Sequence, residues 1–196
     1  MMRNLVPYLA IRNLLKTGDV LLSRPASTLG GLISAATHSP YSHATMIGYA
    51  GVGRNSVMML GETIEHKDAR LIAMSSEIHR WPGYYDLYRP TFSWRPTLAW
   101  AFICRAAGSP YSFRHISRGA VRRFIASAIP PIPNSDLPQW PRSCSALVHA
   151  AMRCAGGPIL REYDCDVSPA DLSDARFFRY IATLYWSQHQ IDGLTK

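Results

Sequence analysis

The chain has few of the features that mark secreted, metal-binding or membrane-spanning proteins. Its 196 residues include only four cysteines, with neither a CxxC pair nor the even spacing of a disulfide framework, so we expect reduced thiols. No HExxH motif occurs, and the spacing of His149 and Cys154 is not typical of zinc ligands, so we expect neither a metal nor another cofactor. No apolar run approaches the ~20 residues of a membrane-spanning helix.

Lysine is also scarce. Lys16, Lys67 and Lys196 are the only lysines, so the net charge of +8 comes almost entirely from arginine. Arginine forks match carboxylate and phosphate groups, which suits an anionic partner, although a solvated basic surface explains the charge equally well. Because no helix-turn-helix, RNA-binding signature or basic run interleaved with aromatic residues is visible, the pattern does not favour nucleic acid.

What the chain does have is enough apolar sequence for one packed domain. Hydrophobic residues make up 47% and charged residues 17%, and the length is that of a single domain. Within residues 1–15, Leu5, Leu9 and Leu14 predict an amphipathic helical extension that packs on this domain. Arg12 interrupts the apolar run and no cleavage site follows, which argues against a signal peptide and predicts a cytoplasmic location.

Strand patterns dominate the first half of the chain. Short apolar or aromatic segments bounded by turn residues predict strands, and the glycine-rich residues 50–55 predict a hairpin between two of them. The predicted strands are Val20–Leu22, Ser42–Tyr49, Ser56–Ile64 and Tyr84–Pro90.

Helix patterns dominate the second half, and together with the strands they predict an α+β fold. Gly108 and Gly156 each follow an apolar helical pattern and end it. The proline-rich residues 130–141 cannot form regular structure, and they lead to Ser143 as a helix cap. The predicted helices are Pro96–Ala107, Ser112–Ala128 and a last one from Cys144 to about Gly156, while Arg176–Trp186 fits either a helix or a strand.

Cys144 is the candidate nucleophile. We expect it in the first turn of a helix, where free amides and the helix dipole lower the thiol pKa and can also hold an oxyanion. Cys104 and Cys154 lie within or at the end of apolar helices, and Cys165 lies in an acidic loop that would raise its pKa. A small buried structural cysteine is the alternative interpretation. These positions predict that Cys144 alkylates fastest near neutral pH.

A cysteine nucleophile needs a base, and the chain contains seven histidines. His43 is the favoured candidate because it lies at the start of a predicted strand, and strand ends commonly border a cleft. His66 and His79 are interpreted as surface residues in a polar stretch, but position alone does not decide against them. His149 shares the helix of Cys144, yet an offset of five residues turns it about 140° away.

A third group would orient the imidazole and stabilise its cation. Glu62 lies on the strand that returns against the His43 strand, so the two can be cross-strand neighbours. Glu65 is the competitor, and strand alternation places it on the opposite face from Glu62. Each carboxylate can also be an ordinary surface charge.

Five segments follow one another along the chain: KTGDVLL from Lys16, YSHATMIG from Tyr41, LGE from Leu60, GSPY from Gly108 and SCSALV from Ser143. Read in this order, they resemble the circularly permuted papain-like relatives of NlpC-type peptidases. The YiiX-like proteins are the nearest group, and lecithin:retinol acyltransferase-like enzymes are more distant. Histidine, acid and cysteine run in this order here, whereas the cysteine comes first in ordinary papain-like enzymes. The resemblance extends from about Lys16 to Ile181 and includes SPADL from Ser168.

The resemblance implies a permuted papain-like domain in which a small antiparallel sheet packs against helices. It implies Cys144 as nucleophile, His43 as base and Glu62 as the orienting acid. Tyr41 and Tyr111 are our own further candidates for a hydroxyl donor. The implied activity is a cysteine hydrolase that cleaves an amide bond, in a peptide or a cell-wall peptide, through a thioester.

Two alternatives stay open at this point. The first keeps the cysteine–histidine pair and changes the substrate to a lipid ester or amide. It rests on the basic amphipathic pattern of Ser112–Ala128, which suits an anionic membrane surface, although a core-packed helix with a solvated basic side gives the same pattern. The second is a binding module that kept the fold and lost the activity.

Overall fold

A computed structural model of the chain describes residues 4–25, 31, 34–35, 39–49, 57–63, 68–80, 83–109, 143–161 and 164–185. For residues 57–63 and Cys165 only the backbone is described. The predicted helix Ser112–Ala128 lies outside these residues, as do Glu65, His66 and Tyr111.

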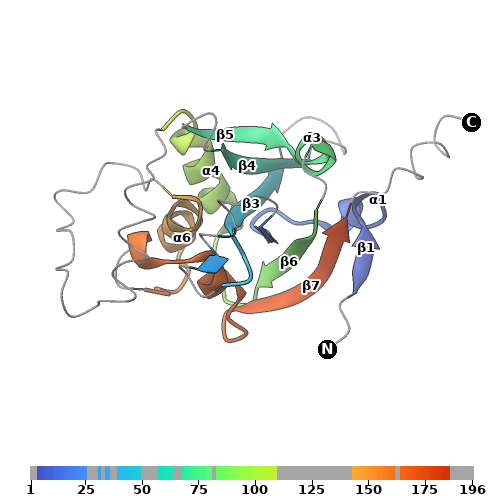
Figure 1. The fold of residues 1–196 in the computed structure, drawn as a ribbon. Coiled ribbons are helices and arrows are strands. Elements are labelled where there is room, and N and C mark those ends of the chain that lie inside the picture. The colour runs from blue at the N-terminus through green and yellow to red at the C-terminus, as the bar shows by residue number, and fades with distance from the viewer. Residues whose placement is uncertain are drawn as a thin grey trace, which may run out of the picture.

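The described strands form one seven-stranded sheet in the order β1-β7-β6-β2-β3-β4-β5 (Figure 1). Neighbouring strands are antiparallel except β1 and β7, which run parallel. The sheet is therefore mixed and larger than the small antiparallel sheet predicted from the sequence. The strands are β1 (Leu5–Pro7), β2 (Val20–Ser23), β3 (His43–Tyr49), β4 (Val57–Thr63), β5 (Asp68–Ala73), β6 (Tyr85–Pro90) and β7 (Phe178–Tyr185).

Helices cover both faces of this sheet, and the fold is α+β, as predicted. In Figure 1, α4 and α6 lie together on one side, while α1 and α3 lie on the other. No helix among the described residues combines the length and the apolar character needed to cross a membrane. The helical elements are α1 (Tyr8–Ile11), η1 (Arg12–Leu14), α3 (Met74–Arg80), α4 (Pro96–Ala106), α6 (Cys144–Cys154), η3 (Asp164–Asp166) and η4 (Pro169–Ser173).

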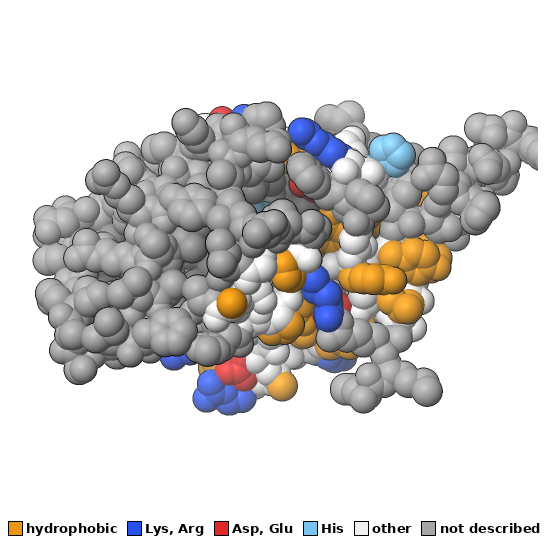
Figure 2. Space-filling view, in the orientation of Figure 1, with side chains coloured by type: hydrophobic (Ala, Val, Ile, Leu, Met, Phe, Trp, Pro, Cys, Tyr) orange, Lys and Arg blue, Asp and Glu red, His pale blue; other side chains and the backbone are white. Residues whose placement is uncertain are grey.

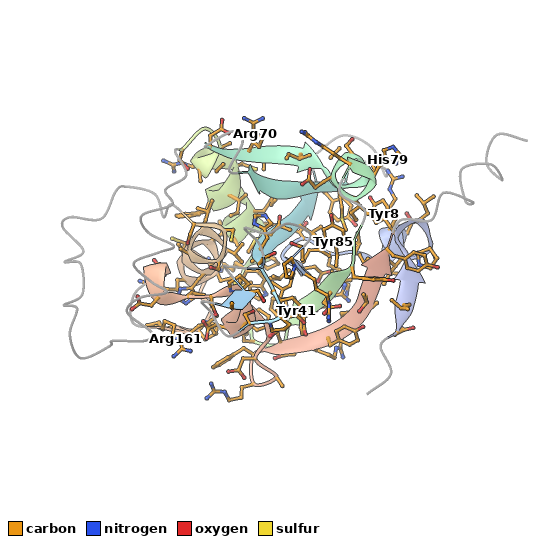
Figure 3. The ribbon with its side chains drawn as sticks, viewed as in Figure 1. Tyr8, Tyr41, Arg70, His79, Tyr85 and Arg161 are labelled. Atoms are coloured by element: carbon orange, nitrogen blue, oxygen red, sulfur yellow. The ribbon has the colours of Figure 1, made fainter. Side chains whose placement is uncertain are left out.

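Strand alternation divides the core into two clusters. Leu22 of β2 and Ala44 of β3 pack with Leu147 of α6 in the first cluster. Leu21, which precedes Leu22, and Ile47, three residues after Ala44, belong to the second cluster, because successive side chains of a strand point to opposite faces. The second cluster also holds Tyr8 of α1, Ile78 of α3 and Tyr85 of β6, and Figure 3 labels both tyrosines.

The strands and helices that flank the candidate site follow the sequence pattern closely. The predicted strands correspond to β2, β3, β4 and β6, and the predicted helices to α4 and α6, to within one or two residues. Gly108 and Gly156 have φ of 85° and 87°, the left-handed conformation that commonly ends a helix. The ambiguous segment Arg176–Trp186 contains strand β7, which lies between β1 and β6.

The N-terminal segment differs from the predicted amphipathic helix. Residues Leu5–Pro7 form β1 beside β7, and only a short α1 and η1 follow. Leu5 and Leu14 are 54% and 66% exposed, whereas Tyr8, Ile11 and Leu15 are buried. On the face shown in Figure 2, hydrophobic side chains gather at the end of the sheet that β1 and β7 form. Pairing with β7, which is remote in sequence, overrides the local helical pattern.

The Gly18-Asp19 pair of the KTGDVLL segment has a structural role. Asp19 is 1% exposed and accepts hydrogen bonds from Nε and Nη2 of Arg89, both at 2.7 Å. It also accepts the backbone N–H of Lys16 at 2.8 Å. Because Arg89 belongs to β6, this bidentate ion pair ties the turn before β2 to the neighbouring strand.

Gly48 is required where α4 packs on β3. A Cβ atom at this position would overlap the indole ring of Trp100 on α4. We expect Gly48→Ala to lower the free energy of unfolding by ~1–3 kcal/mol, the usual cost of overpacking, in urea denaturation followed by circular dichroism. Gly31→Ala is the matched control, because a Cβ there meets no atom within 4 Å. Equal stability of the two variants would contradict the packing described for Trp100.

Candidate active site

Cys144 is the first residue of α6, as predicted. Ser143 precedes it in an extended conformation (φ −135°, ψ 156°), but the Ser143 side chain makes no capping hydrogen bond. The first-turn amides of this 11-residue helix are therefore not capped by that side chain. They are positioned to bind negative charge that develops beside Cys144.

The sulfur of Cys144 lies against the beginning of β3. The backbone N–H groups of Ala44, Cys144 and Ser145 hydrogen-bond to it. The backbone N–H of Ile47 donates to the carbonyl of Asp19, in the turn before β2. Along a strand, successive N–H groups point alternately to its two sides, so the N–H of Ala44, three residues earlier, points away from β2. The sulfur therefore lies at the side of β3 that faces β4, next to the residue that follows His43.

Burial raises the pKa of the Cys144 thiol, contrary to the lowering predicted from the helix N-terminus. The side chain is 5% exposed, and loss of hydration outweighs the N–H hydrogen bonds from Ala44 and Ser145, which lower the pKa. A thiol with a raised pKa gives up its proton less readily than an exposed cysteine does. A cysteine in this state needs a base that removes its proton during attack.

His43 is placed at the same strand end as Cys144. It is the first residue of β3, and its Cα partner on β2 is Ser23. The amide of the next residue, Ala44, contacts the Cys144 sulfur. The structure thus brings the backbone of the predicted base to the predicted nucleophile, although the two are about one hundred residues apart in sequence.

Glu62 lies on β4, where its Cα partner is Ala69 of β5. The described pairs between β3 and β4 join residues 47–49 to residues 57–59, so none of them joins Glu62 to His43. The side chain of Glu62 lies outside the described part of the structure, and Glu65 lies outside it altogether. The assignment of Glu62 as orienting acid stays a prediction.

Tyr41, two residues before His43, belongs to a buried polar network. Its hydroxyl donates to Asp86 Oδ2 at 2.8 Å and lies 2.9 Å from the hydroxyl of Tyr88. Figure 3 shows Tyr41 in the interior of the molecule. Burial, together with the hydrogen bonds to Tyr88 and Asp86, raises the pKa of Tyr41 far above its usual value. The hydroxyl predicted as a donor for substrate is therefore engaged with Asp86.

Asp86 and Arg24 are the site residues that sequence reasoning missed. Asp86 is 1% exposed, and its Oδ2 accepts from Nη2 of Arg24 at 3.0 Å. The one signal in the sequence is a carboxylate within the otherwise apolar and aromatic start of β6. Its partner could not be found locally, because Arg24 lies 62 residues earlier.

His149, which lies on a different side of α6 from Cys144, has partners of its own. It is fully buried. Its Nδ1 lies 2.7 Å from Oδ1 of Asp164, but the direction of the Nδ1–H bond does not meet the geometry of a hydrogen bond. Its Nε2 accepts the backbone N–H of Leu160 at 3.0 Å. Arg153 contacts the same carboxylate of Asp164. These contacts tie α6 to the segment that follows it and leave His149 a structural residue.

The cysteines differ in exposure in a way that determines how they should react with iodoacetamide. Cys104 and Cys154 are exposed, whereas Cys144 is buried, and burial raises the pKa of the Cys144 thiol. We expect Cys144 to be the slowest of these three at pH 7, in a labelling time course followed by peptide mass spectrometry. In urea, its rate should approach that of the other two. Fastest labelling of folded Cys144 at pH 7 would instead support the low-pKa thiolate predicted from the sequence.

Among the described residues, no group of three or more histidine, cysteine, aspartate or glutamate side chains is placed to hold a metal ion.

Comparison with known proteins bears on the fold. No family model matches the chain, and no curated protein matches it. The crystal structure of the metalloprotein YiiX from Escherichia coli O157:H7 matches with a TM-score of 0.51 and 17% sequence identity. The match covers 88% of this chain and 98% of YiiX. At this identity the likeness extends to the fold, and the chain has a YiiX-like α+β fold.

Proposed function

We propose that the protein is a cysteine hydrolase of the circularly permuted papain-like, NlpC-related type. Cys144 is the nucleophile, His43 the general base and Glu62 the group that orients the imidazole. One observation carries the proposal: the sulfur at the N-terminus of α6 contacts the amide that follows His43 at the beginning of β3. A helix terminus supplies amide donors there, and a strand end supplies the base.

Because burial raises the pKa of the Cys144 thiol, the proposed mechanism begins with transfer of the thiol proton to His43. His43 takes the thiol proton as the sulfur attacks the carbonyl carbon, and the carbon–sulfur bond forms. The first-turn amides of α6 stabilise the oxyanion. His43 then protonates the leaving nitrogen as the carbon–nitrogen bond breaks, which leaves a thioester. Water deprotonated by His43 cleaves the thioester, releasing the carboxylic acid and restoring the thiol.

The proposed substrate is an amide, in a peptide or a peptidoglycan-type peptide. The lipid alternative depends on the basic pattern of Ser112–Ala128, which lies outside the described residues, so no structural observation favours it. An inactive binding module would not need a sulfur held by amide donors at the strand end that carries His43.

Covalent labelling with substrate-like electrophiles tests the assignment. A panel of peptidyl acyloxymethyl ketones presents a carbonyl to the nucleophile inside the site, so that binding, rather than exposure, selects the thiol. We expect peptide mapping to find the label on Cys144, with no label at that position in Cys144→Ser and at least tenfold slower labelling in His43→Ala. Cys104→Ser and Cys154→Ser should label like the wild type.

Two further variants identify the third group. Glu62→Gln should slow labelling of Cys144, and Glu65→Gln should change it little. The opposite pair of results would assign the orienting role to Glu65. Labelling confined to the exposed thiols Cys104 and Cys154 would contradict the proposed function.

A further inference from the structure

Arg24 stands beside the candidate base. It directly follows Ser23, the last residue of β2, and Ser23 is the Cα partner of His43. Its side chain is 29% exposed, so solutes can reach it from solvent. The guanidinium therefore lies at the edge of the same strand end that carries His43.

Two contacts hold the guanidinium in place. Nη2 donates to Asp86 at 3.0 Å, and the guanidinium carbon lies 6.0 Å from the centre of the Tyr41 ring. Asp86 is itself fixed, because it also accepts the Tyr41 hydroxyl at 2.8 Å and the Thr183 hydroxyl at 2.5 Å. Arg24 is thus oriented by a buried carboxylate and an aromatic ring, instead of moving freely in solvent.

Arg24 also has hydrogen-bonding capacity that the described residues do not use. Its Nε is buried and has no acceptor. Nη2 donates to Asp86, whereas Nη1 donates no hydrogen bond to a described residue. The buried Nε is closed to a solute, so a ligand with oxygen acceptors would bind the terminal nitrogens of this partly exposed guanidinium.

The strand register relates the carboxylate that holds Arg24 to the residue that contacts the sulfur. Asp86 and Ala44 are the Cα partners of Leu22 on its two sides, and directly opposed residues point to the same face of a sheet. With strands ~4.8 Å apart, Asp86 and Ala44 are separated by about 10 Å. On this spacing, an anion bound to Arg24 and a carbonyl attacked by Cys144 could belong to one substrate.

We propose that Arg24 binds a carboxylate of the substrate, and that the protein hydrolyses acidic peptides or other amides with a carboxylate near the scissile bond. This inference rests on the proposed function. A carboxylate fits better than a phosphate, because Asp86 already neutralises Arg24 and a phosphate dianion would add two charges beside it. The planar guanidinium also pairs well with a planar carboxylate.

Binding tests the inference independently of catalysis. Isothermal titration calorimetry can measure the binding of two series of compounds of equal length. The first series is the monoamides of dicarboxylic acids of four to ten carbons, and the second is the neutral methyl esters of these monoamides. We expect the acids to bind about 10- to 100-fold more tightly than the esters at the length that spans Arg24 and Cys144. Arg24→Gln should remove this difference, and Arg24→Lys should restore only part of it. Arg176→Gln is the control for loss of one positive charge, because Arg176 is exposed and pairs with Asp174.

Turnover provides the second measurement. The mono-p-nitrophenyl esters of the same diacids should be hydrolysed with a higher kcat/KM than the matched methyl-capped diesters, and the ratio should fall to about 1 in Arg24→Gln. Preferential binding without turnover would support the anion site and contradict the hydrolase. Turnover without any preference for the acids, in the wild type itself, would overturn the inference and leave the hydrolase intact. A preference for phosphate-bearing esters over carboxylates would also overturn it, in favour of a phospholipid substrate.

Discussion

Replacing Cys144 with alanine should lower the hydrolysis of p-nitrophenyl acetate by ~10³-fold or more, because loss of the nucleophile removes the covalent route altogether. This activated ester needs no recognition beyond its acyl group, so the result does not depend on the natural substrate. Release of p-nitrophenolate, followed by its absorbance, gives the steady-state rate. A pre-steady-state burst in the wild type would reveal the acyl-enzyme.

Cys104→Ser is the matched control for this experiment. Cys104 is an exposed thiol in the last turn of α4 and can react chemically with the ester. It is not at a helix N-terminus, and the proposed mechanism gives it no histidine as a base. Its loss should leave both the burst and the steady-state rate unchanged. Hydrolysis that survives Cys144→Ala and disappears with Cys104→Ser would show that an exposed thiol, and not the site, was responsible.

Replacing Asp19 with asparagine should lower the free energy of unfolding by ~3–5 kcal/mol, because it leaves the charge of Arg89 without its partner. The Asp19 side chain is 1% exposed and that of Arg89 22% exposed, so water can compensate for only part of the loss. The substitution keeps the shape of the side chain and an acceptor for the Lys16 amide. Urea denaturation at constant pH measures the change.

The exposed pair Asp174–Arg176 provides the comparison for this prediction. Arg176 is 77% exposed, and exposed ion pairs contribute little to stability, so Asp174→Asn should leave the denaturation midpoint nearly unchanged. Removing Arg89 as well, in Asp19→Asn/Arg89→Leu, should recover part of the loss, because no unpaired charge then stays behind. Equal effects of Asp19→Asn and Asp174→Asn would contradict a structural role for the ion pair.

The amino-acid sequence by itself determined the elements on which the candidate site is built. The short apolar segment that ends at Tyr49, the apolar helix that begins at Cys144 and the glycines that end α4 and α6 are local patterns. The preferences of these residues agree with the final fold, so each element could be placed from its own segment. The chain order of histidine, acid and cysteine likewise needed only the sequence.

The tertiary structure decided three things that no local pattern contains. Residues Leu5–Pro7 became a strand because β7 offers them a partner nearly 180 residues away. Arg24 and Asp86 meet because β2 and β6 are neighbours in the sheet. The pKa of Cys144 is raised because β3 and α6 remove water from the sulfur. A helix terminus can be read from sequence, but its effect on a thiol depends on how much solvent the rest of the fold leaves there, since desolvation and hydrogen bonding act on the same charge in opposite directions.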